Sequence, residues 1–315
     1  YPCDIILSTP VIASLNIEVF TGLSSNMFNY LSFLWCIILL VLNWVVKVLE
    51  TNKLKIKLSK GEPVLGTWNT LASPLVTEVL AQSGLDFQII DLEHGPFILD
   101  KLHLHVSACE NSPSCTPLVR IPSKENWMAL QALDQGAHGV VVPHISNSQE
   151  SINLMSSIKY HPFGTRGFTP FSKAGGFNNK NTSSYVNNAN NSILSVVIIE
   201  SQEGLDNLEE IIDVDGVDII YFGAFDLSQA LGCPGEVKNP KVISAIQRGV
   251  EIVNTKGKYA GGFVPQSRDD VKWLLDMGMK FITYDVDSSI IYSQLSDVSD
   301  WFKNEVGNWA VIKKQ

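Results

Sequence analysis

An apolar run at residues 87–90 ends in Asp91, Glu93 and His94, and a Gly-Pro break follows. A short apolar run of this kind predicts a buried strand, and such strands seldom end in several ionisable groups unless those groups are used. A carboxylate beside an imidazole can fix the ring tautomer and raise its basicity, as proton transfer requires. Alternatively, Asp91 or Glu93 caps the next helix. The stretch alone leaves both interpretations open.

Ionisable side chains also follow four later apolar runs. Arg120 ends the third run, and His144 follows the fourth. Glu200 ends the fifth run, and Asp226 lies shortly after the sixth. Two carboxylates from neighbouring strands favour a hard-oxygen site for Mg²⁺ or Mn²⁺ with open positions for water and substrate. Taken singly, each of these two acids is also well explained as a helix cap.

The elements that must position these residues alternate regularly from Gly61 onward. The apolar runs are Val64-Trp68, Phe87-Asp91, Thr116-Arg120, Gly139-Pro143, Leu194-Glu200, Asp218-Phe222, Tyr259-Val264 and Lys280-Tyr284. The predicted helices between them are Pro74-Gln82, Lys124-Gln135, Ser148-Ile158, Glu203-Ile212, Pro240-Thr255, Asp269-Met277 and Asp287-Phe302, with residues 98–109 ambiguous. Eight β/α units over about 240 residues predict a (β/α)8 TIM barrel, with a doubly wound sheet as the alternative.

In such a barrel, active sites form at the carboxyl ends of the strands, where the ionisable residues above fall. The lysines show the opposite distribution, because Lys258 and Lys280 stand at strand beginnings and no lysine ends a run. A Schiff-base aldolase needs a lysine inside the barrel, and the sequence offers no good candidate. Residues 168–191 are rich in Asn, Ser and Gly and are expected to form a loop near the active face.

Composition excludes several classes of protein. The chain has 315 residues, of which 45% are hydrophobic and 17% charged, enough for one large domain plus an extension. The formal net charge is -9 and no dense basic patch occurs, so nucleic-acid binding is not expected. Five cysteines without a C-x-x-C spacing predict a reducing compartment without a zinc site or a disulfide framework.

The first 50 residues form a separate prediction. Residues 31–46 are nearly continuously apolar, and residues 28–49 approach the length of about 20 residues that spans a bilayer. Five lysines follow residues 31–46, and these are Lys47, Lys53, Lys55, Lys57 and Lys60. This asymmetry predicts a transmembrane helix that anchors a cytoplasmic C-terminal domain to the inner face of the membrane. A docking helix or unrelated upstream sequence is the alternative.

The predicted domain organisation follows from these boundaries. Residues 1–50 form the hydrophobic extension, 51–305 the barrel and 306–315 a C-terminal tail.

The ordered motifs of the barrel resemble the HpcH/HpaI aldolase family of metal-dependent class II pyruvate aldolases, whose fold is the phosphoenolpyruvate/pyruvate type of TIM barrel. The matching segments are Gly66-Thr-Trp68, Ile90-Asp-Leu-Glu-His94, Leu118-Val-Arg120-Ile-Pro122, Val141-Val-Pro143, Pro162-Phe-Gly-Thr-Arg166-Gly167, Ile199-Glu200-Ser201, Asp215-Gly-Val-Asp-Ile-Ile-Tyr-Phe-Gly-Ala-Phe-Asp226-Leu-Ser228, Gly278 and Val286-Asp287. Each segment is weak alone, but the ordered set, from about residue 52 to 300, is specific.

The resemblance implies catalytic and metal-binding roles. Glu200 and Asp226 would bind a divalent metal, either Mg²⁺, Mn²⁺ or Co²⁺, which a 2-oxo acid would chelate. Arg120 would stabilise the negative charge on the keto oxygen of the enolate. His94, oriented by Asp91, would carry out general acid-base catalysis.

The same resemblance implies the substrate-binding residues. Arg120 and Trp68 would contact the 2-oxo acid, and backbone amides of Gly223, Ala224 and Phe225 would bind its carboxylate. Arg166 and Gly167 are expected to shape the mouth of the barrel. The family often has Gln where this chain has Ile198, which makes the pocket more apolar and leaves the usual substrate open.

The implied activity is reversible cleavage of a 4-hydroxy-2-oxo acid to pyruvate, or a related 2-oxo acid, and an aldehyde through a metal-bound enolate. Such a carbon-carbon lyase belongs to the aldehyde-lyases, EC 4.1.2.-, and the family implies a homo-oligomer, typically a hexamer. One alternative is a citrate-lyase-like enzyme acting on an acyl-CoA thioester, although the basic surface that CoA needs is not evident. The other is a membrane-tethered, non-catalytic barrel.

Overall fold

The computed structural model describes residues 52–178, 182–264 and 267–306, whose strands form one closed barrel. Each strand pairs in parallel with the next, and β8 pairs with β1 to close the barrel. The strands are β1 (Val64–Asn69), β2 (Phe87–Asp91), β3 (Thr116–Arg120), β4 (Gly139–Val142), β5 (Leu194–Ile199), β6 (Ile219–Phe222), β7 (Tyr259–Val264) and β8 (Phe281–Val286). The predicted (β/α)8 barrel is confirmed, and the doubly wound alternative is wrong.

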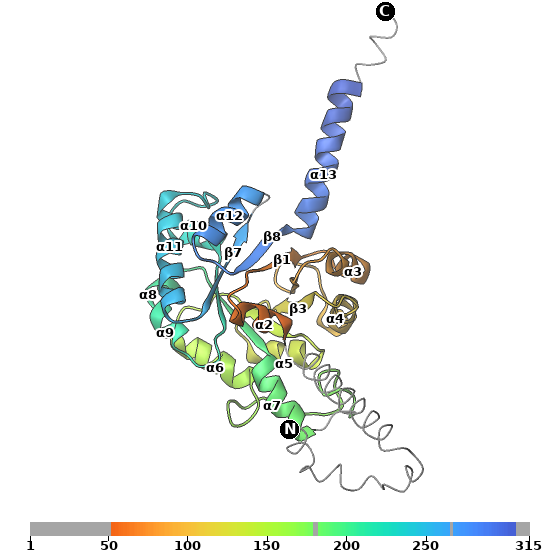
Figure 1. The fold of residues 1–315 in the computed structure, drawn as a ribbon, viewed down its shortest axis with the longest axis vertical. Helices are drawn as coiled ribbons and strands as arrows, with labels where there is room; N and C mark the ends of the chain where they lie inside the picture. Colours follow the sequence, from red (N-terminus) through yellow and green to blue (C-terminus); the bar gives the residue numbers. More distant parts are fainter. Residues whose placement is uncertain (1–51, 179–181, 265–266, 307–315) are drawn as a thin grey trace, which may run out of the picture. The chain divides into compact units, whose positions relative to one another are not determined.

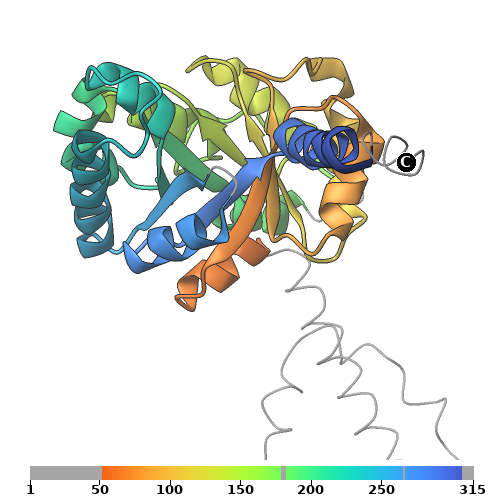
Figure 2. The ribbon, with the colours of Figure 1, turned by 90° about the horizontal axis from the view of Figure 1, so that it is seen from above.

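Helices surround the strands, as Figures 1 and 2 show from two directions. They are α2 (Lys53–Ser59), α3 (Pro74–Gln82), η3 (Leu99–Lys101), α4 (Leu102–Glu110), α5 (Asn126–Asp134), α6 (Ser148–Ile158), α7 (Thr182–Ser192), α8 (Gln202–Asp206), α9 (Leu208–Ile212), α10 (Ala224–Ala230), α11 (Pro240–Thr255), α12 (Arg268–Asp276), α13 (Asp287–Trp301) and η4 (Phe302–Val306). The single helix predicted at 203–212 is two short helices that meet at Asn207.

The interior of the barrel is filled by side chains and closed at one end. Phe87 and Phe281 stack inside it with their ring centroids 4.1 Å apart. Gly66 lies against this pair, because a Cβ added there would come within 2.4 Å of the Phe87 ring. Leu54 and Leu58 of α2 are buried in the same cluster and close the amino-terminal end of the barrel. The core thus fixes the strands whose other ends carry the ionisable residues.

The segment after α6 lies at the amino-terminal end of the barrel, opposite the expected position. Arg166 donates to Asp134 at the end of α5 over 2.7 Å, and Lys173 pairs with Glu110 at the end of α4 over 2.5 Å. The expectations that this segment borders the active face and that Arg166 shapes the mouth are therefore wrong. Its second half is the helix α7 instead of a loop, and its Asn-rich sequence conceals this.

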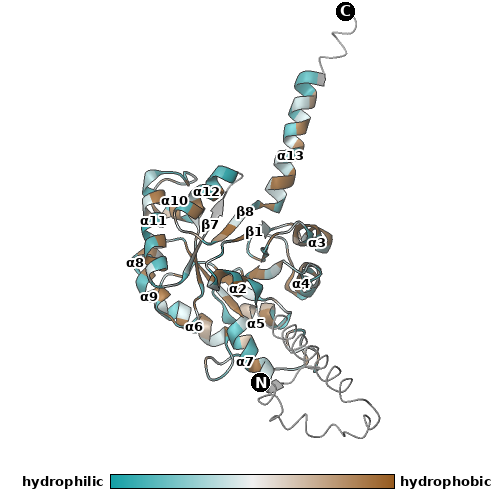
Figure 3. Ribbon diagram, viewed as in Figure 1, coloured by the Kyte–Doolittle hydropathy of each residue, from teal (hydrophilic) through white to brown (hydrophobic). Residues whose placement is uncertain are grey.

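The helix α13 begins directly after β8 and extends outward from it (Figure 1). Its first residue, Asp287, is buried and accepts hydrogen bonds from the N–H groups of Thr70 and Leu71, which fixes the loop after β1. Large apolar side chains along α13 are exposed, including Tyr292 at 75% and Leu295 at 66%, and Figure 3 shows apolar residues along the helix.

The predicted transmembrane segment at 28–49 lies outside the described residues, as do the whole of the extension at 1–50 and most of the tail. None of the helices in the described part of the chain is both long and apolar enough to cross a bilayer.

Candidate active site

Six ionisable side chains gather at the carboxyl ends of five successive strands, from β2 to β6. We call them the strand-end cluster, which consists of Asp91, Glu93, Arg120, His144, Glu200 and Asp226. Neighbouring strands are in parallel register, so residues that end them meet at one end of the barrel. The sequence therefore places its acid-base groups where barrel enzymes carry out chemistry.

Arg120 is held at the centre of the cluster by two acids from β2. Its Nε and one terminal nitrogen donate to the two oxygens of Asp91 over 2.7 and 2.5 Å. The other terminal nitrogen lies 3.1 Å from Glu93. Burial alone would lower the pKa of Arg120, but the hydrogen bond and charge of Asp91 raise it above its ordinary value. The guanidinium is thus permanently charged and its plane is fixed.

An aromatic side chain covers one face of this guanidinium. The Trp68 ring lies 4.4 Å from the central carbon of Arg120, within the range of a cation–π contact. The indole N–H donates to the Tyr221 hydroxyl over 3.3 Å, and that hydroxyl lies 2.7 Å from the Thr283 hydroxyl. Sequence reasoning missed Tyr221 and Thr283. Their signal was a polar group at an inward position within an apolar strand.

His144 joins the Arg120 group to the predicted metal ligands. Its Nδ1 lies 2.7 Å from Glu200 Oε1, and its Nε2 lies 3.2 Å from Glu93 Oε1. Its backbone N–H also donates to Glu200 Oε1 over 2.7 Å. From the sequence, His144 was identified only as a residue that follows a strand. The spacing of residues predicts neither its left-handed backbone conformation nor its two carboxylate neighbours.

Asp226 is close enough to Glu200 for its charge to affect the ionisation of Glu200. Burial raises the pKa of Glu200, and the negative charges of Asp226 and Glu93 raise it further, although His144 opposes them. A Cβ on Gly223 would lie 2.8 Å from Glu200 Oε2, so glycine is needed for the carboxylate to lie over the start of α10. Ile198 packs against the same glycine from inside the barrel.

The donor set of this acid pair fits a hard divalent cation, which favours carboxylate oxygens. Repulsion between the two carboxylates is the kind of electrostatic cost that such a cation removes. Within the described ranges, no group of three or more His, Cys, Asp or Glu side chains converges as a metal cluster. Glu200 and Asp226 would thus supply two ligands, and water or substrate oxygens would supply the others.

The structure corrects the expected relation between Asp91 and His94. The Asp91 carboxylate accepts from Arg120 and from the backbone N–H groups of Glu93 and His94. Asp91 therefore orients Arg120 and the turn after β2. It does not orient the imidazole of His94. His94 is exposed and follows β2 at the same end of the barrel.

The other predicted substrate-binding residues lie at the start of α10. Gly223 is the N-cap of this helix, and Ala224 and Phe225 form its first turn beside Asp226. Phe225 is 52% exposed. Together with Trp68, these residues border the strand-end cluster. Apart from Arg166 and Gly167, the structure thus brings the predicted site residues to one end of the barrel.

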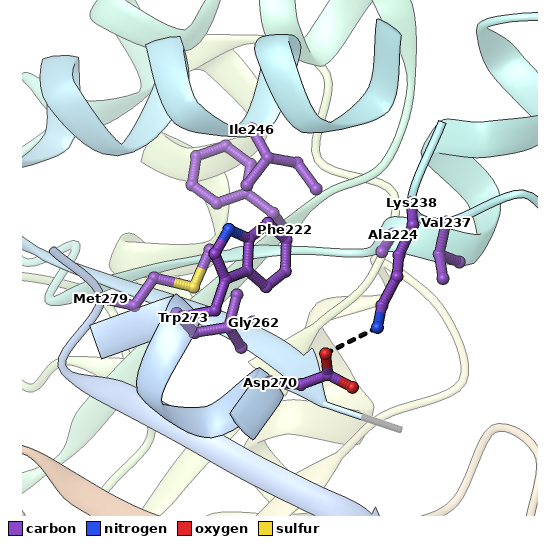
Figure 4. A pocket seen from close by; sticks show the side chains of 10 residues that line it. Phe222, Ala224, Val237, Lys238, Ile246, Gly262, Asp270, Trp273 and Met279 are labelled. Atoms are coloured by element: carbon purple, nitrogen blue, oxygen red, sulfur yellow. Dashed lines mark hydrogen bonds and ion pairs between the residues drawn. The ribbon is translucent and has the colours of Figure 1, made fainter. Parts of the chain in front are cut away.

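A small apolar cavity lies apart from this cluster, between β6, β7 and the helices α10, α11 and α12 (Figure 4). Trp273, Phe222 and Met279 line it, and the ion pair between Lys238 and Asp270, 2.6 Å long, lies at its edge. Its lining is mainly apolar, so it offers few groups that could bind the carboxylate of a 2-oxo acid.

The fold and the strand-end cluster define a TIM-barrel enzyme site of acidic character, and comparisons with known proteins are consistent with this. The model of the HpcH/HpaI aldolase/citrate lyase family matches residues 65–293. A 5-keto-4-deoxy-D-glucarate aldolase from Enterobacter sp. (strain 638) is 34% identical over 252 residues, covering 80% of this chain and 97% of the relative.

Two solved structures share the fold over most of both chains. An HpcH/HpaI aldolase/citrate lyase family protein from Burkholderia cenocepacia is 28% identical with a TM-score of 0.76, over 81% of this chain and all of the other. The citrate synthase SbnG is 30% identical with a TM-score of 0.73, over 80% of this chain and 98% of the other. The chain belongs to the HpcH/HpaI aldolase/citrate lyase family.

Proposed function

We propose that the chain is a metal-dependent aldolase that reversibly cleaves a 4-hydroxy-2-oxo acid into pyruvate, or a related 2-oxo acid, and an aldehyde. The observation that carries the proposal is the strand-end cluster. It contains a fixed, permanently charged Arg120 and a pair of carboxylates, Glu200 and Asp226, that suits a divalent cation. Contacts through Glu93 and His144 join the two groups. This combination matches a reaction in which negative charge develops on a keto oxygen.

Arg120 has donors left for the substrate. A guanidinium carries five N–H groups, and Asp91 and Glu93 engage three of its nitrogens through one contact each. Two N–H groups, one on each terminal nitrogen, remain for the keto oxygen. Because Asp91 and Trp68 fix the guanidinium plane in advance, little reorganisation is needed when charge appears on that oxygen.

The bond changes in cleavage assign a role to His94. A base removes the proton of the C4 hydroxyl, the C3–C4 bond breaks, and its electron pair moves to the C2 oxygen as the enolate forms. The aldehyde leaves, and protonation at C3 then gives the 2-oxo acid. His94 is exposed at the correct end of the barrel and is proposed to move these protons, directly or through water.

Glu200 and Asp226 are proposed to hold the cation, which would be Mg²⁺, Mn²⁺ or Co²⁺. When bound, such a cation polarises the keto group as a Lewis acid. The alternative Schiff-base chemistry needs an accessible amine of low pKa. Burial lowers the pKa of Lys159 to about 8, but this side chain bonds to the carbonyls of Asn190 and Ile193 at the opposite end of the barrel.

The test is release of pyruvate or another 2-oxo acid from a panel of 4-hydroxy-2-oxo acids. The panel includes 5-keto-4-deoxy-D-glucarate, which the name of the relatives suggests. We expect Mn²⁺ to support turnover and EDTA to abolish it. Glu200→Ala should lose both Mn²⁺ binding and turnover, whereas Asp213→Ala, which removes a surface carboxylate paired with Lys256, should change neither.

Two outcomes contradict the proposal. A lysine adduct trapped by borohydride in the presence of pyruvate would replace the metal mechanism with a Schiff base. Absence of turnover on the whole panel, with Mn²⁺ bound, would favour the non-catalytic barrel.

The similarity to a citrate synthase favours a second candidate, in which a 2-oxo acid accepts the enolate of an acyl thioester. Incubation of the protein with oxaloacetate and acetyl-CoA tests this candidate, with release of free CoA as the readout. Turnover in this incubation alone would assign the chain to that reaction.

We also propose that the chain forms a homo-oligomer, hexameric by resemblance to its family. The exposed side chains of α13, including Val298 and Trp301, and Phe302 of η4 support burial against another copy. Light scattering on the full chain tests this, and a monodisperse monomer would contradict it.

A further inference from the structure

His144 occupies an unusual backbone conformation for a residue with a side chain. Its φ is 60°, in the left-handed region, directly after the carboxyl end of β4. Histidine is among the residues that tolerate this region, but the conformation persists only where surrounding contacts hold it. In this conformation the backbone N–H and the imidazole of His144 both point at one acceptor.

That acceptor is a single oxygen of Glu200. The backbone N–H and the ring Nδ1 both lie 2.7 Å from Glu200 Oε1. The second oxygen, Oε2, faces Gly223 at the start of α10, where Asp226 follows within the first turn. His144 therefore occupies one oxygen of the carboxylate, and the other faces the start of α10, the helix that carries the second proposed metal ligand.

The imidazole also reaches the opposite half of the strand-end cluster. Its Nε2 lies 3.2 Å from Glu93 Oε1, and Glu93 Oε2 lies 3.1 Å from Arg120. A series of direct contacts thus runs from the proposed metal ligand Glu200 to the guanidinium that is proposed to face the keto oxygen. The imidazole is 54% exposed, so these contacts and not dense packing determine its orientation.

We propose that His144 is a positioning residue that fixes Glu200 for the divalent cation and joins the metal site to the Glu93–Arg120 group. The inference rests on the proposed metal-dependent function and extends it to a residue outside the ligand pair. Groups that hydrogen-bond to metal ligands typically change metal affinity about 10- to 100-fold when removed. We expect an effect of this size for His144.

The test measures Mn²⁺ affinity of the full chain by electron paramagnetic resonance and calorimetry. His144→Gly keeps the left-handed backbone and its N–H but removes the ring, and should weaken Mn²⁺ binding about 10- to 100-fold. His144→Asn, whose amide can replace the Nδ1 donor at a compatible backbone, should restore most of the affinity. His138→Ala is the matched control, because His138 contacts the carboxylate of Glu110 at the other end of the barrel.

The outcomes distinguish the role of His144 from the existence of the metal site. Unchanged Mn²⁺ affinity in His144→Gly, with binding lost in Glu200→Ala, would overturn the role of His144 and leave the proposed function intact. Mn²⁺ binding that survives Glu200→Ala would overturn the metal site itself. If His144→Gly does not fold, Glu93→Gln carries the test, since it should weaken Mn²⁺ binding and an unchanged affinity would overturn the connection.

Discussion

The two ends of the barrel use similar charged residues in different ways. At the amino-terminal end, bases and acids form pairs, as between Lys57 and Asp86 at 2.5 Å and between Arg166 and Asp134 at 2.7 Å. At the carboxyl end, the strand-end cluster contains four acids, one arginine and one histidine, and two of the acids repel each other. Charge is balanced within these pairs at one end, whereas the strand-end cluster at the other has more acids than bases.

This difference indicates that the charges at the closed end serve stability and those at the open end serve function. Paired charges at the closed end support the fold, as is general for the amino-terminal face of these barrels. At the open end, burial and the charge of Asp226 raise the pKa of Glu200, so keeping it ionised costs folding free energy. Residues arranged for chemistry commonly destabilise the protein that carries them. Removing a carboxylate should therefore raise the free energy of unfolding at the open end and lower it at the closed end.

The largest expected effect concerns His94 at the open end. His94→Ala should lower turnover about 10²–10⁴-fold, the usual range for general acid-base residues, with binding of Mn²⁺ and pyruvate retained. The comparison is His138→Ala at the closed end, which should leave turnover unchanged. Steady-state kinetics with each variant give the ratio, and an unaltered turnover in His94→Ala would show that His94 only belongs to a surface turn.

Arg120→Lys is the next most severe change, since lysine keeps the charge but lacks the planar fork that Asp91 fixes. We expect a loss of about 10²–10³-fold in kcat, comparable with removing one preorganised donor from an oxyanion site. Mn²⁺ affinity measured in parallel should change much less. A lysine variant with full turnover would mean that charge alone, and not fixed geometry, is needed.

Lys159 should make the closed end sensitive to pH. Burial lowers its pKa from 10.5 to about 8, so between these values the unfolded chain holds a proton that the folded chain has released. The free energy of unfolding should therefore rise with pH across this window, by at most about 3 kcal/mol. Urea unfolding from pH 7 to 10 measures it. Lys159→Met should lose the slope, and an equal slope in both proteins would contradict the assignment.

The smallest expected effect is a gain in stability. Glu200→Gln, without metal, should raise the unfolding free energy by about 0.5–2 kcal/mol, because it removes a carboxylate that is buried beside Asp226. Asp218→Asn at the closed end should lower it, since Asp218 pairs with Lys55 at 2.9 Å. Thermal unfolding compares the two. Destabilisation by both would show that the charges at the two ends do not differ in this respect.

The sequence predicted the strands and the location of the site well. Apolar runs bounded by polar residues are local signals, and all eight appear as strands within two residues of their expected ends. The rule that parallel strands end together then brought residues as distant as Asp91 and Asp226 to one end of the barrel. Both steps needed only chain order and the geometry of the fold.

Contacts between side chains were predicted less well. Asp91 was assigned to His94, its neighbour in sequence, but in the structure it binds Arg120 on the adjacent strand. The segment with Arg166 was placed at the wrong end, although it connects the helix α6 to the strand β5 and such connections lie opposite the active face. No role was predicted for His144, because the sequence does not show that a residue other than glycine adopts a left-handed backbone conformation.

The stack of Trp68 on Arg120 gives the protein an optical property. An indole excited state responds to nearby charge, and here the ring lies 4.4 Å from a guanidinium while its N–H is bonded to a phenol. A 2-oxo acid that binds Arg120 would alter the field at this ring before any bond breaks. Light emitted by Trp68 should therefore register the arrival of substrate separately from its cleavage, and Trp68→Phe would remove that signal.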